Sequence, residues 1–157
     1  MKNILGLCVI ALSVLVILTT AHAGGKSFRQ DKLWIETSKG KLEFNVEIAE
    51  TPKQQELGFM NRTEIPADHG MLFIWGKDLP ITMWMKNTPL PLDMLFVDGN
   101  GKIVSIVQNA KPESEDIIDP KKPVRAVIEL LGGVAAAKGI HVGDRVIIHP
   151  YFTHDAS

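Results

Sequence analysis

The stretch at residues 41–48 constrains the fold most, because apolar and polar side chains alternate along it without a break. The apolar residues that share one face are Leu42, Phe44, Val46 and Ile48. A period of two residues indicates a strand that is buried on one face only. Turn residues at 38–40 precede it, so we predict that it pairs with residues 32–37 in an antiparallel hairpin.

Short apolar runs separated by turn residues continue along the chain. They predict further strands at residues 71–75, 81–86, 93–97, 102–107, 124–131 and 144–149. The clearest hairpin signal is Asp-Gly-Asn-Gly at 98–101. Both flanking strands carry apolar residues on both faces, which predicts that both are central strands covered on each side. Residues 109–123 are rich in proline and charge, and they predict a long solvated loop.

Helical signals are confined to two short segments. Thr51, Pro52 and Gln54 have the pattern of a capped helix start, and Gly58 is placed to end that helix. An alanine-rich turn lies within residues 132–139. Short strands with so little helix predict an all-β fold, mainly an antiparallel sandwich or barrel-like, with two short helical segments.

The chain divides into a leader and one domain. Residues 1–23 begin with the short basic start Met-Lys-Asn, continue as an apolar run and end in Ala-His-Ala, which is typical of a secretory signal peptide. We predict a flexible lead-in at 24–31, a single all-β domain at 32–152 and a loose tail at 153–157. The protein is then exported to the periplasm or the extracellular space, without stable membrane insertion after the leader is removed. An uncleaved leader would instead anchor it to a membrane.

Composition excludes several classes of function. Removing the leader takes away Lys2, one of 17 basic residues, and none of the 18 acidic residues, so the net charge becomes −2. A near-neutral chain without a basic block gives no support for binding nucleic acid. The single cysteine, Cys8, lies in the leader, which excludes disulfides, thiolate catalysis and zinc–thiolate sites from the remaining chain. We expect no cofactor and no metal.

The segment at residues 83–93 is the predicted site, because polar side chains follow directly on the apolar Met-Trp-Met at 83–85. The binding candidates are Arg62, Trp84, Lys86, Asn87, Thr88, Asp93 and Glu129. The structural alternative is a turn in which Asn87 and Thr88 bond the backbone and Lys86 pairs with Asp93. Glu129 lies in an otherwise apolar strand, so it is either an edge residue or, as we favour, the ion-pair partner of Arg62.

Several short motifs occur in the order and spacing of the domain of unknown function 192 family, over about residues 42–148. They are Gly-Phe-Met-Asn-Arg at 58–62, Gly-Met-Leu-Phe at 70–73, Trp-Met-Lys-Asn-Thr at 84–88, Pro-Leu-Asp at 91–93, Phe-Val-Asp at 96–98, Gly-Lys-Ile at 101–103, Glu-Leu at 129–130 and Gly-Asp at 143–144. The Trp-Met-Lys-Asn-Thr string is the most specific of these. At Phe59 the family pattern usually has leucine, and the apolar character is kept. The resemblance implies a compact, often exported all-β domain, and it implies no reaction.

Three functional hypotheses follow for this protein of unestablished activity. The leading one is a non-catalytic binding or accessory module for an unknown small molecule, glycan or protein partner. The second is a small hydrolase or lyase in which Asp93 or Glu129 acts as the base and Lys86 stabilises negative charge. The third and most distant is copper(I) binding by Met83 and Met85, because thioethers are soft ligands, although methionines more often fill a core.

Overall fold

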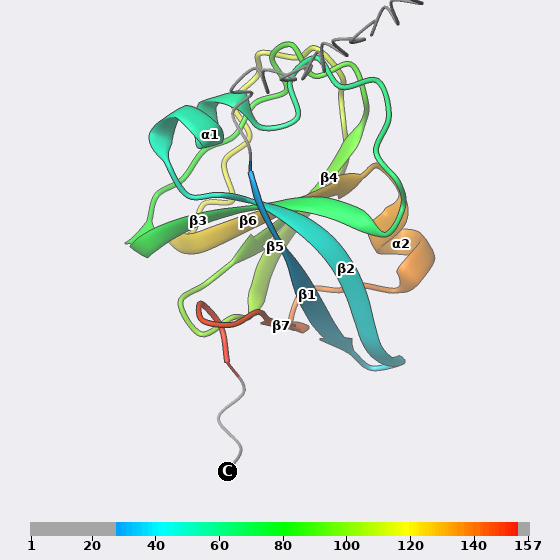
Figure 1. Ribbon diagram of the computed structural model, residues 1–157, viewed down its shortest axis with the longest axis vertical. Coiled ribbons are helices and arrows are strands. Elements are labelled where there is room, and N and C mark those ends of the chain that lie inside the picture. The colour runs from blue at the N-terminus through cyan, green and yellow to red at the C-terminus, as the bar shows by residue number, and fades with distance from the viewer. Residues whose placement is uncertain (1–27, 154–157) are drawn as a thin grey trace, which may run out of the picture.

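The computed structural model describes residues 28–153. The predicted leader, residues 24–27 of the lead-in and residues 154–157 of the tail lie outside this range. The elements in chain order are β1 (Arg29–Thr37), β2 (Gly40–Ala49), α1 (Pro52–Leu57), β3 (His69–Leu79), β4 (Leu92–Val97), β5 (Ile103–Ala110), β6 (Val124–Leu131), α2 (Val134–Lys138) and β7 (Arg145–Ile147). The prediction of an all-β fold with two short helical segments is confirmed (Figure 1).

The strands form one sheet in the order β5-β4-β6-β3-β2-β1-β7. All neighbours are antiparallel except β2 and β3, which run parallel. The two ends of this order meet, because the Ile103 N–H donates to the Asp144 carbonyl at 2.9 Å and the Val146 N–H donates to the Gly101 carbonyl at 2.7 Å. The sheet therefore curls into a barrel, which satisfies polar groups that a free edge would expose.

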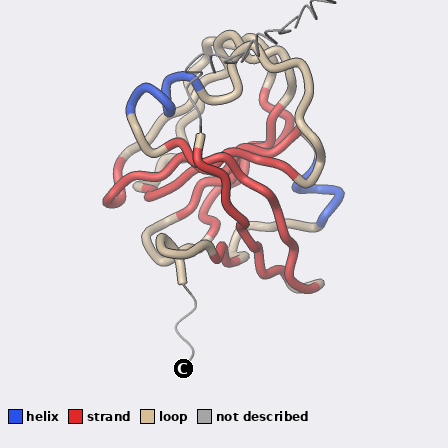
Figure 2. The backbone as a smooth tube through the Cα atoms, viewed as in Figure 1, coloured by secondary structure: helices blue, strands red, loops and turns tan. Residues whose placement is uncertain are grey.

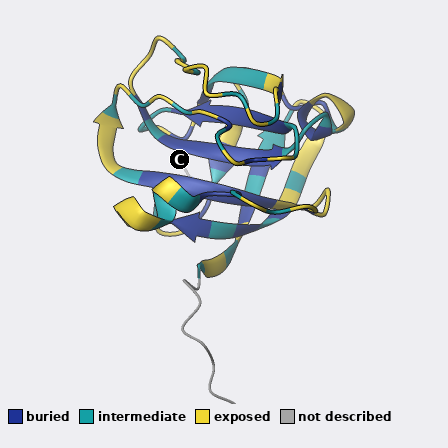
Figure 3. Cartoon of the chain, turned by 90° about the horizontal axis from the view of Figure 1, so that it is seen from above, coloured by how far each residue is buried: buried dark blue, intermediate teal, exposed yellow. Residues whose placement is uncertain are grey.

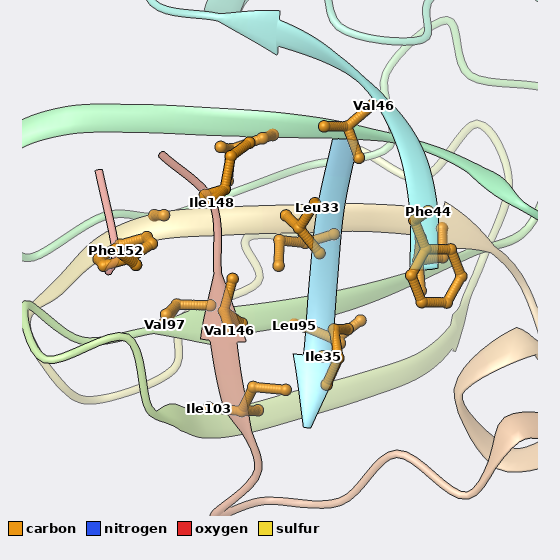
Figure 4. Packing of buried hydrophobic residues seen from close by; sticks show 14 of the residues in the cluster. Leu33, Ile35, Phe44, Val46, Leu95, Val97, Ile103, Val146, Ile148 and Phe152 are labelled. Carbon is orange, nitrogen blue, oxygen red and sulfur yellow. The ribbon is translucent and has the colours of Figure 1, made fainter. Parts of the chain in front are cut away.

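Two apolar clusters lie on opposite faces of the sheet. The inner cluster fills the barrel, where β1, β2, β4, β5 and β7 point aliphatic and aromatic side chains toward one another (Figure 4). Phe44, Val46 and Ile48 contribute from the alternating face of β2, and each is at most 1% exposed. The outer cluster lies on the other face of β3, β4 and β6, and it includes Phe59, Phe73 and Met85.

Loops and α1 gather at one end of the molecule and cover the outer cluster (Figures 1 and 2). The covering segments are the chain from α1 to β3, the β3–β4 connection and the long β5–β6 loop. Most buried residues lie in strands, whereas the turns and loops around them carry most of the exposed residues (Figure 3). No helix among residues 28–153 is long and apolar enough to cross a membrane.

Four sequence predictions about strands need correction. β1 begins at Arg29, not at residue 32, so part of the predicted lead-in is paired with β2. Residues 81–86 form no strand, since only Met83 makes an isolated bridge, with Ile118. β5 lies at the end of the strand order and is only partly buried, whereas β4 is fully buried as predicted. The last strand is shorter than predicted and covers only Arg145–Ile147.

Candidate functional site

A pocket of about 160 Å³ opens between α1, the outer face of β3 and β6, and residues 82–88. We call it the Glu129 pocket, after the residue at its floor. It is lined by Gln55, Glu56, Leu57, Gly58, Phe59, Met60, Phe73, Trp75, Thr82, Met83, Trp84, Lys86, Thr88 and Glu129. Four of the seven predicted binding residues are among them: Trp84, Lys86, Thr88 and Glu129.

The first wall of the pocket is formed by α1 and the residues that follow it, and the two caps of α1 fix its position. Thr51 caps the helix, and the side chain of Gln54 accepts from the Thr51 N–H in a capping box, as the sequence predicts. Gly58 ends the helix with a φ of 45° and donates its N–H to the Gln54 carbonyl. A Cβ at Gly58 would lie 3.2 Å from the Phe73 ring, so a side chain here would crowd the pocket.

The opposite wall is the segment 82–88, held by backbone bonds to the β5–β6 loop. Met83 and Ile118 exchange two N–H···O bonds of 2.9 Å, and the Met85 N–H donates to the Ser114 carbonyl at 2.9 Å. Asn87 has a φ of 54°, which asparagine tolerates better than most residues. Its carbonyl accepts from the Asn61 N–H at 2.8 Å. Asn87 is therefore a turn residue, as in the structural alternative from sequence.

Glu129 forms the floor of the pocket and is 4% exposed. It pairs across the sheet with Met71 of β3 and Met94 of β4, both fully buried. Among the described residues, no hydrogen bond or ion pair involves its carboxyl group. Burial therefore acts on this group unopposed and raises its pKa to about 8. At neutral pH the Glu129 carboxyl group therefore keeps its proton more readily than an exposed glutamate does.

Trp84 and Lys86 stand at the pocket mouth, and the buried Thr88 also lines the pocket. The Lys86 Nζ lies 5.2 Å from the centre of the Trp84 ring, which is a cation–π distance. Trp84 is 40% exposed, which is high for so large an apolar side chain. The Thr88 hydroxyl is buried and donates to the Lys86 carbonyl at 3.2 Å. The mouth therefore combines an exposed indole, an ammonium group and a backbone held in place by Thr88.

Asp93 is buried, but it does not line the pocket. It pairs with Leu130, the neighbour of Glu129 in β6, and successive residues of a strand point to opposite faces. Its carboxylate accepts backbone N–H bonds from Asn109 (2.8 Å), Gly133 (3.1 Å) and Ala135 (2.8 Å). It therefore fixes the start of α2 and the end of β5, and the predicted alternative pairing with Lys86 is wrong.

Arg62 pairs with Glu47, so the predicted ion pair with Glu129 is wrong. The two guanidinium nitrogens of Arg62 donate to the two Glu47 oxygens at 2.5 and 2.7 Å. Glu47 and Glu129 flank Met71 from the two neighbouring strands, which places both carboxyl groups on the same face. The guanidinium also lies 5.1 Å from the Phe59 ring centre. Arg62 thus neutralises the neighbouring acid and leaves Glu129 unpaired.

The two methionines of the copper hypothesis lie in different surroundings. Met83 lines the pocket, whereas Met85 is fully buried in the outer cluster and does not line it. A third methionine, Met60, lines the pocket and accepts a long contact of 4.0 Å from the Asn87 amide. Copper(I) binding stays a prediction.

The sequence reasoning missed the α1 side of the pocket. Gln55, Glu56, Phe59 and Met60 line it, and this region was marked only by the capping pattern, by Gly58 and by the family motif at 58–62, none of which indicated a pocket. The parallel pairing of β2 with β3 brings α1 over β6, and no short-range pattern reveals that pairing.

Together these features define a small β-barrel protein in which the Glu129 pocket lies under the loop layer. The DUF192 family model, described as uncharacterized ACR, matches residues 34–148. The chain therefore belongs to the DUF192 family, which confirms the resemblance seen in the motifs. Comparison with curated proteins gave no match.

Two similar crystal structures support the same fold. A protein from Sinorhizobium meliloti, described provisionally as a transcription regulator, is 44% identical with a TM-score of 0.77, and the match covers 79% of this chain and 97% of that one. A protein of unknown function from Novosphingobium aromaticivorans is 35% identical with a TM-score of 0.75, and the match covers 77% of this chain and 86% of that one.

Proposed function

We propose that the protein is an exported, non-catalytic binding module that takes a small molecule into the Glu129 pocket. The observation that carries the proposal is the buried carboxyl group of Glu129, which has no partner among the described residues. An unpaired ionisable group in an apolar site lowers stability, because burial opposes its charged form. A ligand that pairs with this group would offset that cost.

The walls and the size of the pocket support a small ligand. Phe59, Phe73 and Trp75 provide apolar surface, and a few polar groups converge at the floor and the mouth, which is the usual composition of ligand sites. Sites for drug-sized ligands enclose roughly 300–1,000 Å³. At about 160 Å³, the Glu129 pocket suits a small metabolite, or the end group of a glycan or peptide partner.

A ligand screen on two carboxyl variants tests the proposal. Small metabolites, glycans and peptides are screened by thermal shift against the wild type, Glu129→Gln and the exposed control Glu43→Gln. A ligand that raises the unfolding temperature of the wild type and of Glu43→Gln, and not of Glu129→Gln, supports the pocket. If no compound shifts the wild type, or if hits act equally on all three proteins, the binding proposal fails.

The pKa of Glu129 favours an enzyme as the second candidate. A carboxyl group with a pKa of about 8 exchanges protons near neutral pH, and Lys86 lines the same pocket. Glu129 would be the base or acid of a hydrolase or lyase, with Lys86 stabilising negative charge, whereas Asp93 is excluded from that role by its backbone bonds. Turnover of a screened ligand that disappears in Glu129→Gln, with a rate following one titration near pH 8, would favour this candidate.

The leader supports export, and fractionation tests it. The full chain is expressed with a C-terminal tag, and the intact mass of the protein from the periplasmic fraction and the medium is measured. Cleavage after Ala23 supports the exported form, and an uncleaved chain in the membrane fraction supports the anchored form. Because acidic and basic residues nearly balance, the provisional description of the Sinorhizobium relative as a transcription regulator is not carried over.

A further inference from the structure

Two of the three ionisable side chains that line the Glu129 pocket are acids. Glu129 lies at the floor, Glu56 comes from α1, and Lys86 at the mouth is the one basic residue among the lining side chains. The nearby Arg62 is bound to both oxygens of Glu47. The floor therefore offers a carboxyl group that no cation among the described residues reaches, while the cation of the pocket stands at its entrance.

The walls also suit a positive charge. Aromatic ring faces attract cations, and Phe59, Phe73 and Trp75 line the pocket. Two protein cations already use such faces around it, since the Lys86 Nζ lies 5.2 Å from the Trp84 ring centre and the Arg62 guanidinium lies 5.1 Å from the Phe59 ring centre. The thioethers of Met60 and Met83 complete an apolar, polarisable lining.

We infer that the ligand of the Glu129 pocket is a small organic cation, an ammonium group on a short apolar chain, whose nitrogen pairs with the Glu129 carboxylate. This inference rests on the proposed function and names its ligand class. On binding, the O–H bond of the Glu129 carboxyl group breaks and its proton passes to solvent. The carboxylate that remains accepts the ammonium N–H groups, so no further reactant is needed.

The volume limits the chain length. At about 160 Å³, the pocket is smaller than the roughly 300–1,000 Å³ of sites for drug-sized ligands, so it suits a short chain. An ammonium group on about three to five carbon atoms fills that space. A longer chain would extend out of the pocket mouth into solvent.

Three probes of nearly equal shape test the sign of the ligand charge: butylammonium, butyrate and butanol. Binding is followed by the backbone amide NMR shifts of Gly58 and Thr88, which locate it in the pocket. We expect butylammonium to bind with a Kd of about 1–10 mM, as suits a ligand of five heavy atoms, and the other two at least tenfold more weakly. Glu129→Gln should weaken butylammonium binding at least tenfold, whereas Glu43→Gln should leave it unchanged.

Proton release gives a second readout. With its pKa raised to about 8 by burial, Glu129 in the free protein is mostly protonated at pH 7. Titration calorimetry in two buffers of different ionisation enthalpy should then show close to one proton released per butylammonium at pH 7, and almost none at pH 9.5. Glu56 and Lys86 line the same pocket, and Glu47 with Arg62 lies on the same face. Release that persists in Glu129→Gln would assign the proton to one of these groups and overturn the inference.

Lys86→Met separates a cationic ligand from an anionic one. Removing the like charge at the mouth should strengthen butylammonium binding about two- to fivefold, because like charges repel. If Lys86→Met weakens the binding of butylammonium, the inference is wrong. If butyrate binds more tightly than butylammonium, the ligand is anionic and the inference is also wrong, although the pocket remains a binding site. If none of the three probes binds, the inference fails, and the metabolite screen decides separately on the proposed function.

Discussion

Asp93 and Glu129 are both buried acids on adjacent strands, but they differ in their hydrogen-bond partners. Asp93 is fully buried, and three backbone N–H groups donate to its two oxygens. Glu129 is almost as buried, yet no described group donates to it. Hydrogen bonds to the charged form offset the cost of burial at Asp93, whereas nothing offsets it at Glu129. Burial alone therefore does not distinguish the two acids, whereas the presence or absence of hydrogen-bond partners does.

The largest expected effect is the response of stability to pH at Glu129. The folded protein keeps the Glu129 proton up to about pH 8, whereas the unfolded chain releases it near pH 4.5. Between these values the unfolded state binds fewer protons, so stability falls as pH rises. The difference in pKa corresponds to a loss of about 3–5 kcal/mol in total.

Urea unfolding of the wild type and Glu129→Gln at pH 5 and pH 9 measures this loss. The two proteins should be almost equally stable at pH 5, and Glu129→Gln should be more stable by about 3–5 kcal/mol at pH 9. If the free energy of unfolding depends on pH in the same way in the two proteins, hydrogen bonds offset the burial of Glu129 as they do at Asp93. The contrast between the two acids would then be wrong.

Asp93→Asn should act in the opposite direction. The amide nitrogen of asparagine cannot accept a hydrogen bond, so at least one of the three backbone N–H groups loses its partner. We expect the free energy of unfolding to fall by about 2–4 kcal/mol, since the bonds to a charged group are replaced and a buried donor is left unsatisfied. Faster hydrogen exchange at the Ala135 amide would locate the damage at α2. A variant as stable as the wild type would show that these bonds contribute little.

Arg62→Gln tests which acid the arginine serves. The Arg62–Glu47 pair is bidentate but partly exposed, so its loss should cost only about 1 kcal/mol. The stability difference between pH 5 and pH 9 should stay as large as in the wild type, because Arg62 does not compensate Glu129. If that difference grows in the variant, Arg62 also stabilises the Glu129 carboxylate, and the pocket floor is less isolated than its contacts indicate.

Local patterns in the sequence predicted the local structure well. The alternation around Phe44 predicted β2, the Thr51 and Gln54 pattern predicted the capping box, and the turn residues at 98–101 predicted the β4–β5 hairpin. Each of these features is set by residues close in sequence. The change from apolar to polar side chains at residues 83–93 led to the predicted site, and Trp84, Lys86 and Thr88 of this segment line the Glu129 pocket.

Long-range pairing could not be predicted in the same way. Residues 81–86 have the apolar character of a strand, but their backbone bonds go to the β5–β6 loop and not to the sheet. Arg62 pairs with Glu47 and leaves Glu129 without a partner in the described part of the chain. The parallel pairing of β2 with β3 places Glu47 two strands from Glu129 on the same face. Whether a buried charge has a partner depends on the residues of neighbouring strands, and local sequence patterns do not show which residues those are.

Lys86→Ala should have the smallest effect on stability. Its ammonium group lies at the pocket mouth over an exposed ring, where a cation–π contact contributes only about 0.5–1 kcal/mol. Phe96→Ala provides a scale for the loss of stability, because Phe96 lies in the outer cluster and removing a buried phenylalanine costs roughly 3–5 kcal/mol. Urea unfolding of both variants at pH 7 compares them directly. A loss at Lys86 equal to that at Phe96 would mean that the mouth holds the loop layer onto the sheet, and Lys86 would then belong with Asp93 as a structural group.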